Sequence, residues 1–469
     1  MNIIVIIADT YRYDNLFDRA GNHPNGMTVR TPALDKFSER AVSLSRLYTA
    51  SFPTIPHRTD FTTGRYGWPW YPWQDRRLSS ANHAPDMLRE AGYVSQLLGD
   101  CPHLFPAHFN QGFDAAYALR GQEGDLSFLR MNRRIEQTMP PEKTRFERNK
   151  FQKRNLPDLH RWTNSHWRTE MDTFPPRTAG LAVEWLEENY QYHPFFLWVD
   201  FFDPHEPWDP PEYMVNRYDP AYTGTPMIHP NYGMASSLSA DEQRNLRAHY
   251  CAEAELVDRW VGRIFQKIDV LALWDNSIVV FMSDHGMCLG EHNRTGKSNI
   301  SEGDERWWPL YPEIAHIPFM VAAPGLEGGR TVDAIIQPPD ILPTLLELAG
   351  VDVTPSDPFH GKSFAAALRG DDSPPLHKFA ITAKYVRNND EGELPRYVMT
   401  PMLYTTEWAY TPVGSSLDGA PELYAIADDY YAEQNVIDQY PQIADGLHNK
   451  FLGWMRAMGA PEDAIAVYA

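Results

Sequence analysis

The stretch Ser51-Phe-Pro-Thr-Ile-Pro-His-Arg-Thr-Asp-Phe-Thr-Thr-Gly-Arg65 organises the rest of this chain. It predicts a loop that ends at Pro53 and a helix that begins near Thr54, because proline is tolerated in a first helical turn. A hydroxyl at that helix start lies at the positive end of the helix dipole, which favours an anionic ester. Arg58 can offer a planar, bidentate fork to phosphate or sulfate. The alternative interpretation is a threonine N-cap with an arginine ion pair.

Within this stretch, Thr54-Ile-Pro-His-Arg58 followed by Thr63-Gly64 resembles the nucleophile motif of the sulfatases, in the alkaline phosphatase superfamily. That motif reads Cys or Ser, any residue, Pro, any residue, Arg, with Thr-Gly at the spacing found here. A frame that starts at Ser51 lacks the arginine, so Thr54 takes the nucleophile position. Threonine departs from sulfatases and is what nucleotide pyrophosphatase/phosphodiesterases use. The resemblance therefore implies a threonine nucleophile and no formylglycine.

Length and composition describe a large globular chain. Its 469 residues, 43% of them hydrophobic, are enough for a large domain and a smaller one. A net charge of −20 argues against a nucleic-acid-binding surface and means that an anionic substrate needs a metal or local basic residues. Three cysteines are an odd number and too few for a disulfide framework, which suits a reducing compartment.

The sequence also bears on the compartment. The apolar run Asn2–Ala8 is short and lacks a basic flank and a cleavage site, so we predict no signal peptide. No apolar run approaches the roughly 20 residues that a membrane span needs. We therefore expect a cytoplasmic protein that binds no membrane, and we leave a homo-oligomer open.

The first expected strand leads to a candidate metal ligand. Asn2–Ala8 is rich in β-branched residues, which predicts a central parallel strand buried on both faces. Asp9 and Thr10 follow at its carboxyl end, where open α/β sheets bind ligands. Sulfatases carry two metal-bound aspartates here, so the resemblance implies Asp9 as a ligand and Thr10 as a weak one. An aspartate in this place can also be a helix N-cap.

A second expected strand, Ser277–Met282, delivers Ser283-Asp-His-Gly286. With Lys297 twelve residues after His285, this segment resembles the second sulfatase signature. The resemblance implies that Asp284 and His285 bind the metal and that Lys297 contacts the non-bridging oxygens of the ester.

A third expected strand, Pro194–Asp200, leads to Asp203-Pro-His-Glu-Pro207, which resembles the family's Asp-Pro-His-x-Pro segment. His205 would then face the leaving-group oxygen, and an imidazole can protonate a departing alkoxide near neutral pH. Taken alone, a histidine in a loop is more often incidental.

One segment departs from the family pattern. Gly99-Asp-Cys-Pro-His103 resembles the family's Gly-Lys-Trp-His, but Asp100 replaces the lysine and His103 comes one residue late. Either Asp100 and His103 join a metal site or the segment has lost its role, and the sequence leaves both alternatives open.

Other segments complete the outline. Ser239–Leu273 predicts a long helix that starts with a capping box. Ile317–Gly325 resembles the last strand of the family's large sheet. Residues 120–175 are polar and indicate a solvated excursion, or alternatively a loop over the active site or an oligomer contact. Their basic residues include Arg130, Arg133, Arg134, Arg145, Arg148 and Lys150.

The resemblance implies an alkaline phosphatase-like α/β fold. We expect a large, mixed and mostly parallel sheet sandwiched by helices in residues 1–375, and a smaller α+β subdomain in residues 376–469. The expected activity is that of a metal-dependent hydrolase acting on a small anionic ester: a phosphate diester, a phosphate monoester or a phosphonate monoester. A sulfuric ester hydrolase and an inactive, sulfatase-like binding protein are the alternatives.

The same resemblance assigns roles within the site. It implies one divalent ion, Mn²⁺, Zn²⁺ or Ca²⁺, and leaves a second metal open. The ion would be surrounded by the Thr54 oxygen and by Asp9, Asp284 and His285. Arg58 and Lys297 would hold the equatorial oxygens of the ester, and His205 would protonate the leaving group.

Overall fold

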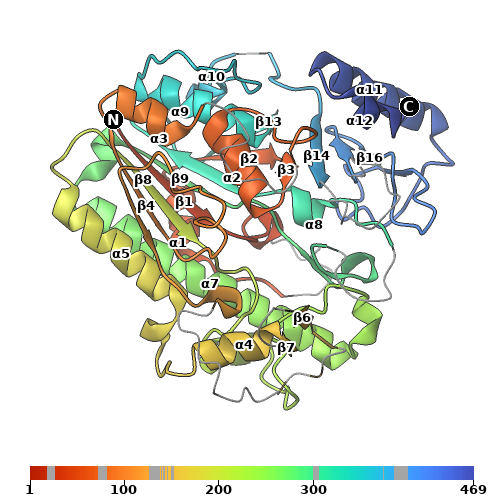
Figure 1. Cartoon of the computed structure of the whole chain (residues 1–469), viewed down its shortest axis with the longest axis horizontal. Helices are drawn as coiled ribbons and strands as arrows, with labels where there is room; N and C mark the ends of the chain where they lie inside the picture. Colours follow the sequence, from red (N-terminus) through yellow and green to blue (C-terminus); the bar gives the residue numbers. More distant parts are fainter. Residues whose placement is uncertain are drawn as a thin grey trace.

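The computed structural model describes most of the chain. Its described residues are 1–17, 27–71, 82–125, 138, 140, 143–144, 146–148, 153–298, 306–372, 374–384 and 400–469. They form a large sheet between two layers of helices, with a second, smaller sheet to one side (Figure 1). None of the helices in these ranges combines the length and the hydropathy that a membrane crossing requires.

The large sheet has eight described strands in the order β13-β2-β12-β9-β1-β8-β4-β5. Their bounds are β1 (Asn2–Ala8), β2 (Val42–Leu47), β4 (Val94–Gly99), β5 (Ala115–Ala118), β8 (Phe195–Phe201), β9 (Ser277–Met282), β12 (Phe319–Ala322) and β13 (Arg330–Ile336). The central strand β1 is parallel to β8 and β9, whereas β12 is antiparallel to β9 and β2. The sheet is therefore mixed and mostly parallel, as predicted. The prediction that the strand near Ile317 is the last was wrong, because β13 follows it and forms the edge.

Two apolar cores flank the sheet because successive side chains of a strand point to opposite faces. On β1, Ile4 and Ile6 belong to one core, and Ile3 and Val5 belong to the other. The first core is covered by α1 (Pro32–Ser38), α5 (Phe174–Asn189) and α7 (Ala240–Val270), and the second by α2 (Thr54–Thr63), α3 (Ala84–Glu90), α9 (Ile341–Ala349) and α10 (Ala365–Arg369). These helices make up the two outer layers in Figure 1.

The predicted start of the long helix is confirmed. Ser239 is the N-cap of α7, and its hydroxyl accepts a hydrogen bond from the Glu242 backbone N–H at 3.2 Å. The Glu242 carboxylate accepts one from the Ser239 N–H at 2.8 Å, which completes the capping box.

The smaller sheet has the order β17-β16-β15-β14-β3. Its strands are β3 (Ser51–Phe52), β14 (Ala380–Lys384), β15 (Met402–Tyr404), β16 (Ala409–Thr411) and β17 (Glu422–Tyr424), and α11 (Pro441–Ala457) and α12 (Glu462–Ala466) follow them. β3 pairs in parallel with β14, so the residues just before Thr54 are held by the C-terminal sheet. The domain boundary near residue 375 stays a prediction.

The excursion at residues 120–175 is partly packed. It contains β6 (Phe146–Arg148), β7 (Lys153–Asn155) and α4 (Leu156–Thr163), and α4 buries Leu156 and Leu159. Of its basic cluster, Arg130, Arg133, Arg134, Arg145 and Lys150 lie outside the described residues. The remaining short elements are α6 (Glu212–Tyr218), α8 (Pro312–Ala315), β10 (Cys288–Leu289), β11 (Thr295–Gly296) and the 3-10 helices Tyr13–Asn15, Gln122–Gly124, Glu170–Asp172, Ala235–Ser237, Leu273–Asn276, Glu291–Asn293 and Pro338–Asp340.

Candidate active site

Side chains that follow two adjacent strands converge at the carboxyl edge of the large sheet. Asp9 follows β1, and Asp284 and His285 follow β9. One ligand atom from each of the three lies within 4.8 Å of the others, and all three side chains are fully buried. Nε2 of His285 is 3.8 Å from an Asp9 oxygen and 3.6 Å from an Asp284 oxygen. The structure thus brings together three residues that the sequence nominated as metal ligands.

The His285 ring is oriented as a metal ligand is. Its Nδ1 lies 3.1 Å from the Gly286 carbonyl oxygen, to which it can only donate, so the Nε2 lone pair faces the two carboxylates. Nε2 is buried and has no hydrogen-bond partner among the described residues. Burial lowers the pKa of His285 to about 3, which keeps the imidazole neutral. A lone pair facing two carboxylates fits a divalent cation between them.

The charges of the two carboxylates support the same fit. Burial raises the pKa of Asp9 well above its ordinary value, and the neighbouring Asp284 carboxylate raises it further. Burial acts on the Asp284 pKa in the same direction, but His285 and Arg58 outweigh it and lower that pKa. At Asp9, burial and the Asp284 carboxylate outweigh Arg58 and Lys297, so the side chains of Asp9, Asp284 and His285 together lack positive charge. Carboxylates with one imidazole suit Mn²⁺, Zn²⁺ or Ca²⁺, and the residues do not select among them.

The N–H groups of the Arg58 guanidinium all donate hydrogen bonds to acceptors within the protein. Its Nε and Nη2 donate to the two Asp200 oxygens at 2.8 Å each. Nη1 donates to Asp284 at 2.6 Å and to the Thr54 carbonyl at 3.0 Å, and Nη2 also donates to Asp9 at 3.2 Å. All five N–H groups of the guanidinium therefore have acceptors. With these bonds made, no donor is left over for an equatorial oxygen of the ester, and the guanidinium holds the carboxylates of Asp9 and Asp284; the contact of Arg58 with the ester stays a prediction.

Asp200 is a residue of the site that sequence reasoning did not single out. It lies inside the buried strand β8 and is fully buried, and its carboxylate also accepts from the indole N–H of Trp198 at 2.9 Å. The available signal was a charged residue within an apolar run, since aspartate is almost never fully buried without a partner.

Thr10 connects the metal-ligand group to Lys297. The Thr10 hydroxyl donates to Asp9 at 2.8 Å and accepts from the Lys297 ammonium at 3.0 Å. The Thr10 N–H donates to Asp284 at 3.0 Å. Its φ of 63° lies in the left-handed region, which is strained for a β-branched residue and is found at functional sites. Lys297 also lies 3.7 Å from Glu206, so its ammonium is held beside the group. Thr10 as a ligand stays a prediction.

Thr54 is the first residue of α2, with Pro53 as the N-cap, and it is buried. The sequence predicted this helix start. Nη1 of Arg58 bonds both the Thr54 carbonyl and Asp284, so the residue stands beside the metal-ligand group. The role of its hydroxyl as nucleophile and ligand stays a prediction.

His57, which sequence reasoning passed over, lies three residues after Thr54 and so on the same face of α2. Its Nδ1 is 3.0 Å from the Thr49 hydroxyl, and its Nε2 is buried without a hydrogen-bond partner among the described residues. Burial lowers the pKa of His57 to about 3, against the opposing effect of Asp284. The imidazole is therefore neutral beside the site.

His205 is held in one orientation. Its ring stacks on Phe202 with centroids 3.9 Å apart, and Nδ1 lies 2.6 Å from the Glu206 carbonyl oxygen. Because that oxygen only accepts, Nδ1 carries the proton and Nε2 is the exchangeable position. Burial lowers the pKa of His205 well below its ordinary value, and Lys297 lowers it further. The ring is therefore neutral in the free protein.

Asp100 and His103 have other partners. One Asp100 oxygen accepts from the Phe202 N–H at 2.9 Å, and the other accepts from the Gln122 amide at 3.1 Å. His103 lies 3.0 Å from Glu123. In the described part of the chain neither belongs to the metal-ligand group. Asp100 joins the end of β4, the loop after β8 and the start of the excursion.

Comparison of the sequence with known proteins identifies a family and several relatives. A family profile described as Sulfatase matches residues 1–351. An arylsulfatase of Clostridium perfringens is 26% identical over 386 residues, covering 76% of this chain and 76% of that protein. Arylsulfatase K of Homo sapiens is 22% identical over 493 residues, covering 96% of this chain and 81% of that protein.

Comparison with solved structures agrees on the fold. A phosphonate monoester hydrolase of Agrobacterium radiobacter superposes with a TM-score of 0.72 at 22% identity, covering 97% of this chain and 96% of that one. A 2-O GAG sulfatase superposes with a TM-score of 0.66 at 19% identity, covering 98% and 92%. Both have a large mixed sheet between helices, which is the predicted fold.

Proposed function

The chain belongs to the sulfatase family of ester hydrolases. Within this family, we propose that it hydrolyses phosphorus esters through a covalent phosphothreonine at Thr54. The substrates would be phosphate diesters, phosphate monoesters or phosphonate monoesters. The observation that carries the proposal is the threonine at the first residue of α2, beside the metal-ligand group.

The chemistry of threonine favours phosphorus over sulfur. Sulfatases use a formylglycine made from Cys or Ser, whose hydrate takes up sulfate on one oxygen and expels it by re-forming the aldehyde. Thr54 cannot supply that group, because its extra methyl means that oxidation gives a ketone. Release of sulfate from a sulfated threonine would therefore require water to attack sulfur. A phosphorylated threonine can be released by a second in-line displacement at phosphorus.

The residues of the site would bind the metal ion and position its ligands. Asp9, Asp284 and His285 would hold a divalent cation, with the Thr54 oxygen as a fourth ligand. When bound, that cation offsets the negative charge of the ester and lowers the pKa of a coordinated hydroxyl. Arg58 donates one hydrogen bond to each of the two ligand carboxylates, Asp284 and Asp9, and so keeps them in place before substrate binds.

The Thr54 hydroxyl would first lose its proton to solvent, and its oxygen would attack phosphorus as the alkoxide, the form in which it is later released, while the bond to the leaving oxygen breaks. Lys297 would bind the non-bridging oxygens, and Nε2 of His205 would give its proton to the leaving oxygen. The neutral His205 of the free site takes up that proton when the anionic ester approaches, because nearby negative charge raises the pKa of an imidazole. Water would then attack the phosphothreonine, give its proton back to Nε2 and free Thr54.

Sulfate-ester hydrolysis is the second candidate. It is favoured by sequence relatives that are named arylsulfatase, among them the Clostridium protein. The two candidates differ at the nucleophile, where this chain carries threonine.

A substrate screen separates them. The wild-type protein, loaded in turn with Mn²⁺, Zn²⁺ and Ca²⁺, is assayed on aryl esters with one shared leaving group: a sulfate, a phosphate monoester, a phosphate diester and a phosphonate monoester. The proposal predicts the highest kcat/KM on a phosphorus ester. Thr54→Ser should keep part of that activity and Thr54→Ala should lose it. Faster turnover of the sulfate ester than of every phosphorus ester would overturn the proposal.

A further inference from the structure

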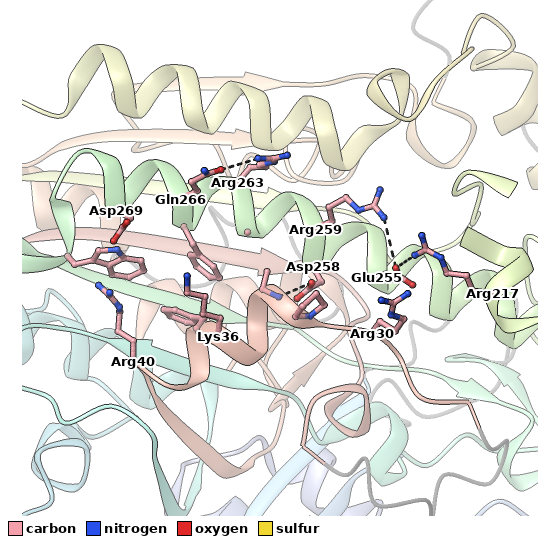
Figure 2. A pocket seen from close by; sticks show the side chains of 16 residues that line it. Arg30, Lys36, Arg40, Arg217, Glu255, Asp258, Arg259, Arg263, Gln266 and Asp269 are labelled. Carbon is pink, nitrogen blue, oxygen red and sulfur yellow. Dashed lines mark hydrogen bonds and ion pairs between the residues drawn. The ribbon is translucent and has the colours of Figure 1, made fainter. Parts of the chain in front are cut away.

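A groove of about 680 Å³ lies between α1 and α7 (Figure 2). Its volume is in the range of small-molecule sites. Its lining contains none of the candidate active-site residues: Tyr250 of α7 contacts the Thr10 carbonyl at 2.9 Å, whereas the lining begins at Glu255, about 8 Å further along the helix at 1.5 Å per residue, and runs on to Asp269.

The groove is basic, although the chain has a net charge of −20. Three acidic residues line it, and six basic ones: Arg30, Lys36, Arg40, Arg217, Arg259 and Arg263. Figure 2 shows Lys36 and Arg40 toward one end, and Arg30, Arg217 and Arg259 toward the other. Positive charge thus lines both ends of the groove.

Two of the acidic residues are already engaged. The Asp258 carboxylate accepts from the N–H groups of Ala33 at 3.1 Å and Leu34 at 2.8 Å, at the start of α1. Glu255 forms an ion pair with Arg217 and accepts from the Tyr218 hydroxyl at 2.8 Å. By contrast, no carboxylate of the described chain forms an ion pair with Lys36 or Arg40, and both side chains are exposed. These cations are available to a ligand.

Aromatic side chains underlie the same groove, and Phe37 and Phe265 among them are buried, with exposures of 4% and 8%. The rings of Phe37 and Phe265 stack with centroids 4.3 Å apart, and Trp274 lies 6.0 Å from Phe37. The Arg40 guanidinium lies 4.4 Å from the centre of the Trp274 ring. A guanidinium held on an indole keeps the N–H groups at its edge for an anion. What the groove offers a ligand is therefore mainly its cations, which match a molecule with two or more anionic groups.

We propose that the groove between α1 and α7 binds a small polyanion with two or more phosphate, sulfate or carboxylate groups. Lys36 and Arg40 would bind an anionic group at one end, and Arg30, which is exposed, would bind another at the opposite end. The binding does not depend on the hydrolytic reaction, so the proposal stands apart from the assignment of the active site.

Pyrenetetrasulfonate is a suitable probe, because its sulfonates are bonded through carbon and no ester hydrolase can remove them. Its fluorescence anisotropy is followed as metal-loaded protein is added, with pyrenemonosulfonate in parallel. We expect saturable, one-site binding of the tetrasulfonate and binding of the monosulfonate that is about tenfold weaker or more. Lys36→Glu with Arg40→Glu should weaken tetrasulfonate binding about tenfold or more and leave hydrolysis unchanged.

Lys450→Glu with Arg456→Glu is the matched control, since it makes the same change in net charge at two exposed residues of another helix, α11, far from the groove in sequence. It should change the dissociation constant by less than about twofold, as remote screened charges do. Equal weakening by this control pair would show non-specific attraction and overturn the proposal. So would the absence of saturable binding, or competitive inhibition of hydrolysis by the probe, which would place it in the active site.

Discussion

Replacing Arg58 by lysine separates a residue that positions the site from one that binds substrate. The Arg58 guanidinium donates five hydrogen bonds, four of them to Asp9, Asp200 and Asp284, and all four side chains are fully buried. Lysine keeps the positive charge but has three N–H donors and no planar fork. It cannot bond both Asp200 oxygens in the same geometry and still reach the metal-ligand carboxylates.

The size of the effect follows from the bonds lost. At least two of the five hydrogen bonds must go, and a hydrogen bond to a charged group is worth about 1.5–3 kcal/mol. We expect Arg58→Lys to lower the free energy of unfolding by about 3–6 kcal/mol, a large part of the roughly 5–15 kcal/mol typical of a folded protein. The ligand carboxylates should also lose their positions, so metal affinity should fall.

Urea unfolding in the presence of EDTA measures the free energy of unfolding without a contribution from bound metal, and elemental analysis measures metal content. Lys297→Met is the comparison variant, because Lys297 donates to Thr10 and lies 3.7 Å from Glu206, whereas Arg58 bonds the ligand carboxylates themselves. That variant should raise KM or lower kcat while its metal content stays close to that of the wild type. If Arg58→Lys instead keeps wild-type stability and metal content and only raises KM, Arg58 is a substrate ligand and the reasoning fails.

Three further substitutions test other parts of the site and fold. Asp284→Ala should lose most bound metal and activity, and stoichiometric metal by elemental analysis would remove Asp284 from the site. His205→Ala should slow alkyl esters more than activated aryl esters, whose leaving groups need no proton, by part of the roughly 10²–10⁴-fold that general acids supply; equal losses would contradict this. Burial lowers the pKa of His316 to about 3, so the neutral ring is favoured in the fold and stability is lost as the pH falls below about 6.5. His316→Gln should remove about 1.4 kcal/mol per pH unit from that slope, measured by urea unfolding between about pH 4 and 6, and an unchanged slope would contradict the assignment.

The strands that lead to the site were predictable because they are buried on both faces. Asn2–Ala8 and Ser277–Met282 are nearly continuous apolar runs, and both predicted bounds match the structure. The edge strand β13 was missed because its sequence, Arg-Thr-Val-Asp-Ala-Ile-Ile, mixes charged and apolar residues, as a partly exposed strand does.

The contacts across the fold were not readable from local patterns. Arg58 and Asp200 are separated by 142 positions, and a sequence motif says nothing of which acid a buried guanidinium meets. The motif therefore suggested a substrate contact for Arg58, whereas the fold uses all its donors. In the same way β3, just before Thr54, pairs with β14 near the other end of the chain.

The most direct test of the central claim is a search for the phosphothreonine. Wild-type protein is mixed briefly with an activated phosphodiester, quenched in acid and digested, and the peptide that contains Thr54 is examined by mass spectrometry. The account predicts a phosphoryl group on Thr54, absent from Thr54→Ala and reduced in Thr54→Ser. Turnover of the phosphodiester without any adduct on Thr54, or an adduct on another residue, would contradict it.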